Sequence, residues 1–284
     1  MIKKLKTSEH GTPEQIVEHY QLEKKLADKL RNSSREERAE LYTEVYDELF
    51  TKIPYHSQLT RKADDQSRQI SVDKKLQFLK HYLKPDSTFL EVGPGDCSLS
   101  LAVCQQVKQV YAVDVSSEVT ENNHHPDNFK LIISDGVSIP VEANSVTIAY
   151  SDQLMEHLHP DDAFLQLQNI YQSLAESGIY ICITPNRLSG PHDVSKYFDE
   201  TATGFHLKEY TVTELINLFR QVGFTDIKVS FGCRGLYLRP PLFIYQWTEI
   251  FLDALPFVIR NKFTSNILVN NFLGITIIAK KKNS

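Results

Sequence analysis

The residues best suited to chemistry in this chain are two acidic side chains and two glycines beside short apolar runs. Residues 88–98 read Thr-Phe-Leu-Glu-Val-Gly-Pro-Gly-Asp-Cys-Ser, which places Glu91 just before Gly93 and Gly95. Glycine lets backbone N–H groups approach a ligand where a Cβ would collide. A carboxylate at Glu91 favours a cationic or hydroxyl-bearing ligand and repels a pyrophosphate. Asp114, nineteen residues beyond Gly95, ends a second apolar run, where it is placed to accept hydrogen bonds from ribose hydroxyls.

The spacing of apolar residues predicts the elements that position these groups. Phe89, Leu90 and Val92 suit a buried parallel strand, and the apolar positions from Leu99 to Val107 suit the inner face of a helix. The other strands are expected at 110–113, 129–133, 146–150, 179–183, 224–231 and 272–279. Strands that alternate with helices predict an α/β fold with a doubly wound, mostly parallel seven-stranded sheet. Ligands bind such sheets at the carboxyl ends of the strands.

The pattern Glu-x-Gly-x-Gly, followed by an apolar strand that ends in Asp, resembles the class I S-adenosylmethionine-dependent methyltransferases of the type 11-like group. The dinucleotide fingerprint G-x-G-x-x-G is not met, because Ser98 holds its last glycine position. Cys97 stands where the methyltransferases have a third glycine. The resemblance covers about residues 76–281 and implies a Rossmann-like fold whose last strand is antiparallel to the others. It also implies S-adenosyl-L-methionine as cofactor, bound by Glu91, Gly93, Gly95 and Asp114.

The resemblance assigns further cofactor contacts after the next three strands. Val115 opens a segment expected to cap the next helix and to flank the adenine. Asp135 and Gly136 match the place that supplies an acidic side chain and a backbone N–H to the adenine, although Asp and Gly also serve the backbone of a turn. Ser151 and Gln153 match the segment under the methionine portion of the cofactor.

The long segment 184–210, which has no periodic pattern, carries most of the candidate catalytic groups. Long loops in a compact domain are usually functional or disordered, and the aromatic residues in this one argue against disorder. Methyl transfer from a sulfonium needs an aligned nucleophile and, for a hydroxyl acceptor, a group that takes up a proton. Histidine has a suitable pKa for that step. The candidates for base or substrate contact are His192, Asp193, His206 and His157, with a packing role open for each histidine. Arg187 is expected to hold an anionic acceptor group, and Tyr197 to contact the substrate.

The composition limits the class of protein. The 284-residue chain carries a formal charge of −5 at pH 7, which argues against a broad nucleic-acid-binding surface. Its four cysteines show no C-x-x-C pairing and no metal-ligand spacing, so reduced thiols and no metal site are expected. No apolar run follows the basic amino terminus, and no charge-free segment approaches the roughly 20 residues that span a bilayer. A cytoplasmic enzyme without stable membrane insertion is expected.

Two segments extend beyond the basic fold. Residues 1–70 are expected to form a helical cap, with a third helix starting near Ser71, and residues 71–284 the methyltransferase domain. The cap either covers the sheet edge or closes as a lid that excludes water. The apolar insertion at about 232–270 is interpreted as core packing, a wall of the acceptor pocket, a homodimer interface or a weak membrane contact.

The expected function is methyl transfer from S-adenosylmethionine to a small-molecule or glycan acceptor. The histidines of the loop between Arg187 and Tyr210 favour oxygen over nitrogen as the acceptor atom. Two alternatives remain open. One is an NAD-dependent oxidoreductase, which Glu91 and the missing glycine disfavour. The other is a non-catalytic subunit that binds S-adenosylmethionine or a partner and has lost the chemistry.

Overall fold

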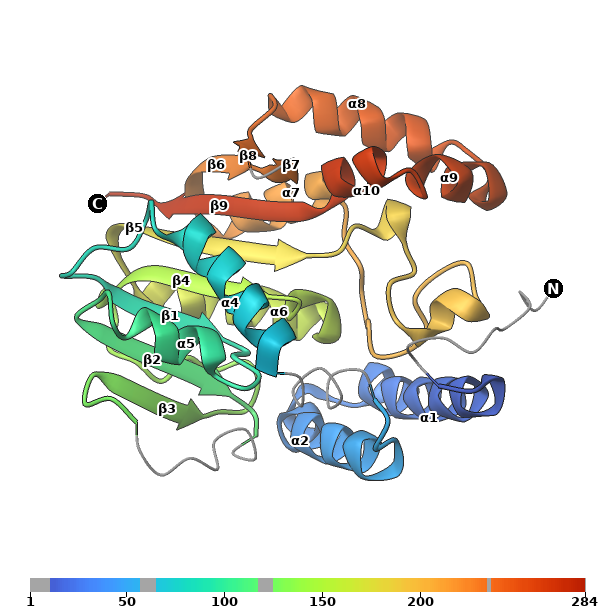
Figure 1. Ribbon diagram of the computed structural model, residues 1–284, viewed down its shortest axis with the longest axis horizontal. Helices are drawn as coiled ribbons and strands as arrows, with labels where there is room; N and C mark the ends of the chain where they lie inside the picture. Colours follow the sequence, from blue (N-terminus) through green and yellow to red (C-terminus); the bar gives the residue numbers. More distant parts are fainter. Residues whose placement is uncertain (1–10, 57–64, 117–124, 234–235, 284) are drawn as a thin grey trace.

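The computed structural model describes residues 11–56, 65–116, 125–233 and 236–283. Its main sheet has seven strands in the order β3-β2-β1-β4-β5-β9-β6 (Figure 1). The strands are β1 Thr88–Val92, β2 Gln109–Asp114, β3 Phe129–Ile133, β4 Val146–Asp152, β5 Leu174–Thr184, β6 Phe224–Val229 and β9 Ile275–Lys281. Strands β1 to β5 pair in parallel, and β9 runs antiparallel to β5 and β6. The predicted mostly parallel α/β sheet with a reversed last strand is therefore confirmed.

Helices cover both faces of this sheet. On one face, α4 (Asp65–Leu79) and α5 (Ser98–Val103) share a core with Phe89 and Val110. On the other face, α6 (Pro160–Ser173) and α7 (Val212–Val222) share a core with Leu90. Successive side chains of a strand point to opposite faces, so Phe89 and Leu90 belong to different cores. By the same alternation Glu91 faces α5.

The parallel strands point toward one side of the molecule, where α1, α2 and the loop after β5 also lie (Figure 1). This loop contains two short 3-10 helices, η2 (Arg187–Ser189) and η3 (Val194–Tyr197). A third, η1 (Met155–His157), follows β4. Ligands of such sheets bind at the carboxyl ends of the strands. The loop after β5 and η1, which carry the predicted catalytic residues, lie at these ends together with α1 and α2.

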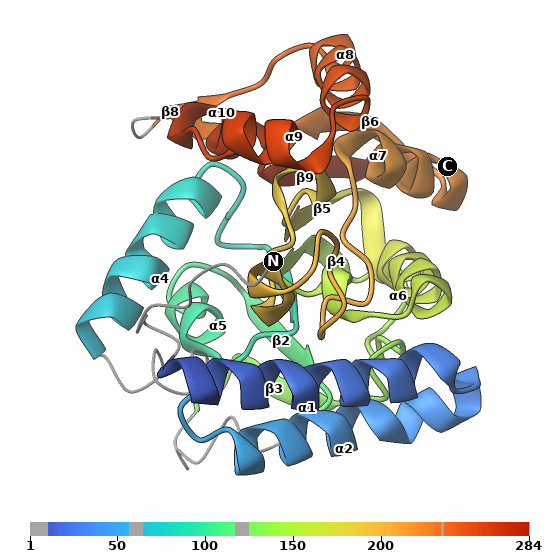
Figure 2. The ribbon, with the colours of Figure 1, turned by 90° about the vertical axis from the view of Figure 1, so that its right-hand side faces the viewer.

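The cap consists of two helices that lie side by side, α1 (Pro13–Asn32) and α2 (Arg35–Lys52) (Figure 2). Each starts with a capping box, Thr12 with Gln15 and Ser34 with Glu37. Residues 1–10 and 57–64 of the predicted cap lie outside the described residues. Helix α4 begins at Asp65, six residues before the expected start at Ser71. The sequence pattern missed these first turns because they are polar and exposed and so lack apolar spacing.

The segment after β6 forms a hairpin, β7 (Phe231–Cys233) with β8 (Leu236–Leu238), and a layer of three helices. These are α8 (Leu242–Asp253), α9 (Phe257–Thr264) and α10 (Ile267–Leu273). Their outer side exposes large apolar residues: Phe243, Ile244, Trp247, Ile250, Phe251, Val258, Ile259, Phe263, Ile267 and Leu268. Core packing therefore accounts for only part of this segment, chiefly Tyr245, Leu252 and Leu273. No helix among the described residues is long and apolar enough to cross a membrane.

Candidate active site

A pocket of about 460 Å³, called the inner pocket here, lies at the carboxyl ends of β1 and β2. Side chains that follow four neighbouring strands meet in it, and two tyrosines of α2 close it from the cap. The lining residues are Tyr42, Tyr46, Val92, Gly93, Val113, Asp114, Val115, Ser134, Gly136, Ser138, Ile139, Leu154, His157, Leu158 and Gln166. The structure thus brings the predicted Gly93, Asp114, Val115 and Gly136 into one concave site.

The turn after β1 needs glycine for its backbone. Gly93 and Gly95 have φ of +69° and +58°, a region that L side chains rarely adopt. A Cβ on Gly93 would stand 2.9 Å from Leu154 Cδ1, whereas one on Gly95 would meet nothing within 4 Å. Cys97 also has a positive φ of 56°, which explains why the methyltransferases place a third glycine there. Gly93 lines the pocket, and Gly95 shapes the turn beneath it.

Asp114 is held at the end of β2 by the backbone that follows it. Its Oδ1 accepts hydrogen bonds from the N–H groups of Val115 at 2.7 Å and Ser116 at 3.3 Å. This fixes the carboxylate on the pocket wall. The helix expected after Val115 falls largely on residues 117–124, which lie outside the described residues.

Five predicted cofactor ligands do not line the inner pocket: Gly95, Gln153, Glu91, Asp135 and Ser151. The last three have partners within the protein. Glu91 lies on the opposite face of β1, where the hydroxyl of Ser100 donates to it, and burial raises its pKa to about 7. Asp135 accepts hydrogen bonds from the backbone N–H groups of residues 137 and 138 and so holds its own turn. Ser151 pairs with the Tyr180 hydroxyl at 2.7 Å. Direct contact of these side chains with the cofactor stays a prediction.

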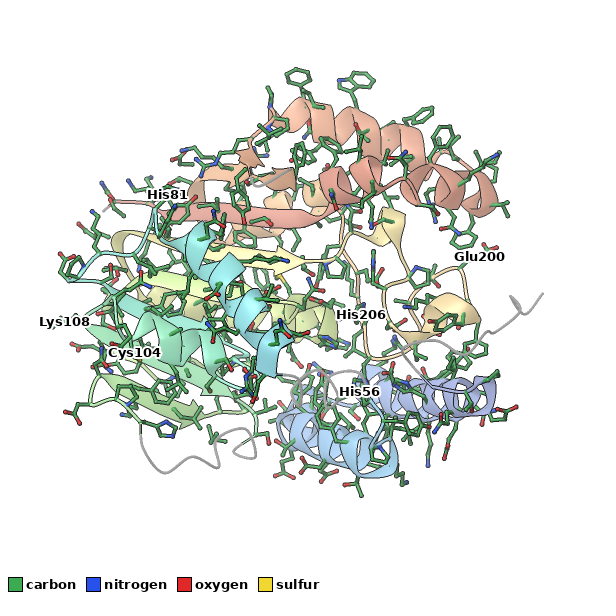
Figure 3. The ribbon with its side chains drawn as sticks, in the orientation of Figure 1. His56, His81, Cys104, Lys108, Glu200 and His206 are labelled. Carbon is green, nitrogen blue, oxygen red and sulfur yellow. The ribbon has the colours of Figure 1, made fainter. Side chains whose placement is uncertain are left out.

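A second, larger hollow of about 890 Å³ lies between the cap and the loop after β5. We call it the cap cavity. It contains five histidines, His19, His56, His157, His192 and His206, and is also lined by Glu23, Tyr46, Leu49, Gln153, Asp193, Val194, Lys196, Tyr197 and Phe205. Figure 3 shows His56 beside the α1–α2 pair and His206 on the loop side. Tyr46 and His157 line both hollows, so the two hollows adjoin there.

The imidazoles of this cavity differ in charge. His157 Nδ1 lies 3.1 Å from the Phe205 carbonyl oxygen, which can only accept, so Nδ1 carries the hydrogen and Nε2 the lone pair. Burial and the nearby His206 lower the pKa of His157 to about 3. His206 Nδ1 lies 2.7 Å from Glu209 Oε1. Although burial lowers the pKa of His206, the hydrogen bond to Glu209 and the charge of Glu156 raise it to about 9.

His192 is a neutral imidazole. Its Nε2 lies 3.2 Å from the Asn186 carbonyl oxygen and 3.0 Å from the Ser189 hydroxyl. The carbonyl oxygen can only accept, so Nε2 carries the hydrogen and Nδ1 keeps its lone pair. Burial lowers the pKa of His192 below its usual value, which leaves the ring able to accept a proton.

Two other predicted loop residues have structural partners. Asp193 lines the cap cavity, and its Oδ2 accepts from the N–H groups of Gly204 at 2.9 Å and His206 at 3.3 Å. Arg187 lines neither hollow, because its guanidinium donates to Asp253 of α8 at 3.0 Å. The structure therefore does not bring Arg187 to the site, whereas Tyr197 and Gln153 do line the cap cavity.

The sequence interpretation missed the contribution of the cap to this cavity. His19 Nε2 lies 2.7 Å from Glu23 Oε1, and Glu23 Oε2 accepts from the Phe205 N–H at 3.2 Å. Burial raises the pKa of Glu23, but hydrogen bonds with His19 and His56 outweigh it and lower the value to about 2. The available signal was the spacing of His19 and Glu23, which puts both on one face of a helix.

The strand order, the reversed β9 and the acidic end of β2 match the class of enzyme that the sequence resembles, the class I methyltransferases. A family model described as a methyltransferase domain matches residues 61–229. The chain therefore belongs to this family and is an S-adenosylmethionine-dependent methyltransferase. The match leaves no support for the oxidoreductase alternative. No curated protein matches the chain.

Many solved structures share the fold. Phosphoethanolamine N-methyltransferase 1 of Haemonchus contortus, in complex with phosphoethanolamine and S-adenosylhomocysteine, is 13% identical with a TM-score of 0.60, over 89% of this chain and 50% of that one. The complex of the Haloferax volcanii Trm112 methyltransferase activator with a methyltransferase is 15% identical with a TM-score of 0.53, over 77% of this chain and 95% of that one. A methyltransferase of Archaeoglobus fulgidus is 19% identical with a TM-score of 0.50, over 75% of this chain and 94% of that one. At these identities the likeness shows the fold alone.

The inner pocket fits S-adenosylmethionine. Gly93 leaves room for a ligand beside the backbone, Asp114 offers a carboxylate for ribose hydroxyls, and Val92, Val115 and Ile139 supply apolar walls for a base. The mixture of apolar walls with a few polar groups is that of a small-molecule site.

Proposed function

We propose that this enzyme methylates a hydroxyl oxygen of a small-molecule or glycan acceptor, and not a nucleic acid, bound in the cap cavity. The observation that carries the proposal is the junction of the two hollows at Tyr46 and His157. Residues of the inner pocket would hold the cofactor, and the junction would give its methyl group access to an acceptor held by the residues of the cap cavity. The polar lining of the cavity suits an acceptor with several hydrogen-bonding groups. A cytoplasmic location remains part of the proposal.

The residues of the cap cavity provide what methyl transfer to oxygen requires. S-adenosylmethionine, when bound, supplies an electrophilic methyl group on a sulfonium. The hydroxyl must lose its proton as the new bond forms, and His192 has a neutral ring with a lone pair on Nδ1 for this purpose. His157 and His206 stand at the junction and orient the acceptor oxygen. Residues of the cap helices line both hollows, which supports the lid interpretation.

The experiment supplies methyl-labelled S-adenosylmethionine to the purified enzyme with panels of hydroxylated small molecules and glycans, and detects labelled products by mass spectrometry. Replacing His192 with Gln is expected to reduce transfer at least about a hundredfold, the usual contribution of a general base. Calorimetric titration with S-adenosylhomocysteine should show unchanged binding in His192→Gln and loss of binding in Asp114→Ala.

Three results would overturn parts of this proposal. Absence of S-adenosylhomocysteine binding by the wild type would remove the cofactor site. Tight binding with no transfer to any acceptor, including those of a cell extract, would favour the non-catalytic alternative. Methylation at nitrogen alone would exclude the hydroxyl acceptor.

We also propose that the exposed apolar layer of α8–α10 is the interface of a homodimer. Exposed apolar patches larger than a few hundred Å² are unusual on monomers and mark interaction sites. The one exposed carboxylate of α8, Asp253, is already paired with Arg187 and Arg260. A second copy would therefore meet few unpaired charges there.

A further inference from the structure

The turns after β4 and β5 bring one carboxylate and two imidazoles together at the junction of the two hollows. Glu156 and His157 lie in η1, and His206 comes from the long loop. One nitrogen of each imidazole and one carboxylate oxygen lie within 4.8 Å of one another. Two histidines and a carboxylate form a common ligand set for divalent transition metals.

Glu156 has a buried oxygen that the surrounding protein does not satisfy. The side chain is fully buried. Its Oε2 accepts from the Thr184 hydroxyl at 2.9 Å, whereas Oε1 has no hydrogen-bond partner among the residues that the structure describes. Buried polar atoms nearly always have a partner. A bound cation would give this buried oxygen a partner.

The two imidazoles are held as metal-binding histidines usually are. Such a histidine donates its other ring N–H to a carboxylate or a backbone carbonyl, which fixes the ring and leaves one nitrogen for the metal. His206 Nδ1 is paired with the Glu209 carboxylate at 2.7 Å, and His157 Nδ1 with the Phe205 carbonyl oxygen at 3.1 Å. The Nε2 atoms of both rings are therefore the ones that face away from these partners, and a metal would bind Nε2 of His206 by displacing its proton.

We propose that Glu156, His157 and His206 bind one divalent transition-metal cation of the Mn²⁺ to Zn²⁺ series. Three protein ligands leave coordination positions open, as in catalytic metal sites. His157 and His206 line the cap cavity, whereas Glu156 is buried and lines neither hollow. The open positions of the metal therefore face the acceptor.

This inference rests on the proposed function and deepens it by assigning how the acceptor is held. An acceptor hydroxyl coordinates the metal, which lowers the pKa of that hydroxyl. The O–H bond breaks and its proton passes to His192. The oxygen then forms a bond to the cofactor methyl group as the carbon–sulfur bond breaks, and that electron pair stays on sulfur. An acceptor with a second oxygen beside the first, such as a vicinal diol, would chelate the metal and bind best.

The test uses the full chain, stripped of metal with a chelator and titrated with Co²⁺. Binding is followed by calorimetry and by the visible absorption of the cobalt. We expect one site per chain in the wild type. Glu156→Gln and His206→Gln should weaken Co²⁺ binding at least about a hundredfold, since each removes a ligand. Glu209→Gln removes no metal ligand but changes the acceptor of His206 Nδ1 and of the His192 N–H, so it should weaken Co²⁺ binding about ten- to a hundredfold.

The chain offers a matched control in a second cluster of the same cavity, His19, Glu23 and His56. There His19 Nε2 and His56 Nε2 lie 2.7 Å and 3.7 Å from Glu23 Oε1, and Glu23 Oε2 accepts from the Phe205 N–H, so both carboxylate oxygens already have partners in the protein. His56→Gln should leave Co²⁺ binding unchanged. Binding that is lost in His56→Gln and kept in Glu156→Gln would move the metal to the cap and overturn the assignment.

Titration with S-adenosylhomocysteine separates this inference from the proposed function. If the wild type binds S-adenosylhomocysteine but not Co²⁺, the cluster is an imidazolium–carboxylate group and the metal site is excluded, while the methyltransferase proposal stands. If S-adenosylhomocysteine does not bind, the proposed function fails whatever the metal does. Normal S-adenosylhomocysteine binding by Glu156→Gln shows that the variant is folded, so its loss of Co²⁺ then supports the site.

Discussion

Glu91 illustrates how one strand position decides the role of a side chain. Phe89 and Glu91 point to the α5 side of β1, because strand residues alternate. The carboxylate is therefore buried against Ser100, below the turn that shapes the pocket. The positive charge of Lys75 of α4 lowers the pKa of Glu91 and so partly offsets the effect of burial. The Nζ atom of Lys75 itself lies 2.9 Å from Asp152 Oδ2. The acid of the Glu-x-Gly-x-Gly pattern supports the turn in this structure.

The burial of Glu91 predicts a pH-dependent stability. Its pKa is about 7 in the folded chain, against an ordinary value of 4.5 for this carboxyl, so the folded state holds the proton more tightly than the unfolded state. The protonated carboxyl of Glu91 contributes its full stability to the fold below about pH 4.5, and this stability is lost as the pH rises through about 7. Glu91→Gln should therefore match the wild type near pH 4 and exceed its unfolding free energy by up to about 3 kcal/mol at pH 8.

Urea denaturation at the two pH values measures this effect. The exposed Glu142 provides the control, since Glu142→Gln should follow the wild type at both. A difference between Glu91→Gln and the wild type that does not grow with pH would contradict the burial argument.

At the scale of elements, the cap is joined to the sheet domain by a buried ion pair. Arg38 of α2 donates from Nε to Asp162 Oδ2 at 2.6 Å and from Nη2 to Oδ1 at 2.8 Å. The Tyr42 hydroxyl donates to the same carboxylate at 2.8 Å and accepts from the His159 N–H at 2.9 Å. Both charged side chains are almost fully buried. This contact positions Tyr42 on the wall of the inner pocket.

Replacing Arg38 with Met leaves the Asp162 carboxylate buried without its partner, which is expected to cost roughly 3–5 kcal/mol of unfolding free energy. Chemical denaturation measures the loss. Arg35→Met, on the exposed side of the same helix, should change stability little. If the two variants were equally stable, the ion pair would not hold the cap.

The sequence predicted the sheet and the helices α1 and α2 well, because those elements follow local rules: apolar runs, capping boxes and glycine turns. It predicted the positions of Gly93, Asp114 and Gly136 for the same reason, since each comes at the end of a strand. It could not predict that Arg187 pairs with Asp253 and lines neither hollow, because Asp253 lies in a distant helix. The sequence singled out His157 and His206 separately but gave no signal that they meet with Glu156, since His206 is far from the other two in the chain and joins them only in the fold.

At the scale of the whole molecule, the proposed dimer gives a direct prediction. Trp247 and Phe251 are 69% and 56% exposed on neighbouring turns of α8. Replacing both with Glu places charges in the proposed interface and should convert a dimer to a monomer in multi-angle light scattering. Ile133, 49% exposed on β3, lies elsewhere, so Ile133→Glu should remain dimeric. A monomeric wild type would exclude the dimer and point to a different partner for this layer.

The acceptor cavity is framed by two segments from distant parts of the chain, the paired helices before the sheet and the loop after β5. They fit each other closely, since Glu23 accepts from the Phe205 N–H and Arg31 donates to the carbonyl oxygens of residues 203 and 204. A hybrid enzyme that receives only one of the two segments should lose these hydrogen bonds between them. Transplanted together, they should carry acceptor preference from one methyltransferase to another while the recipient keeps its own nucleoside site.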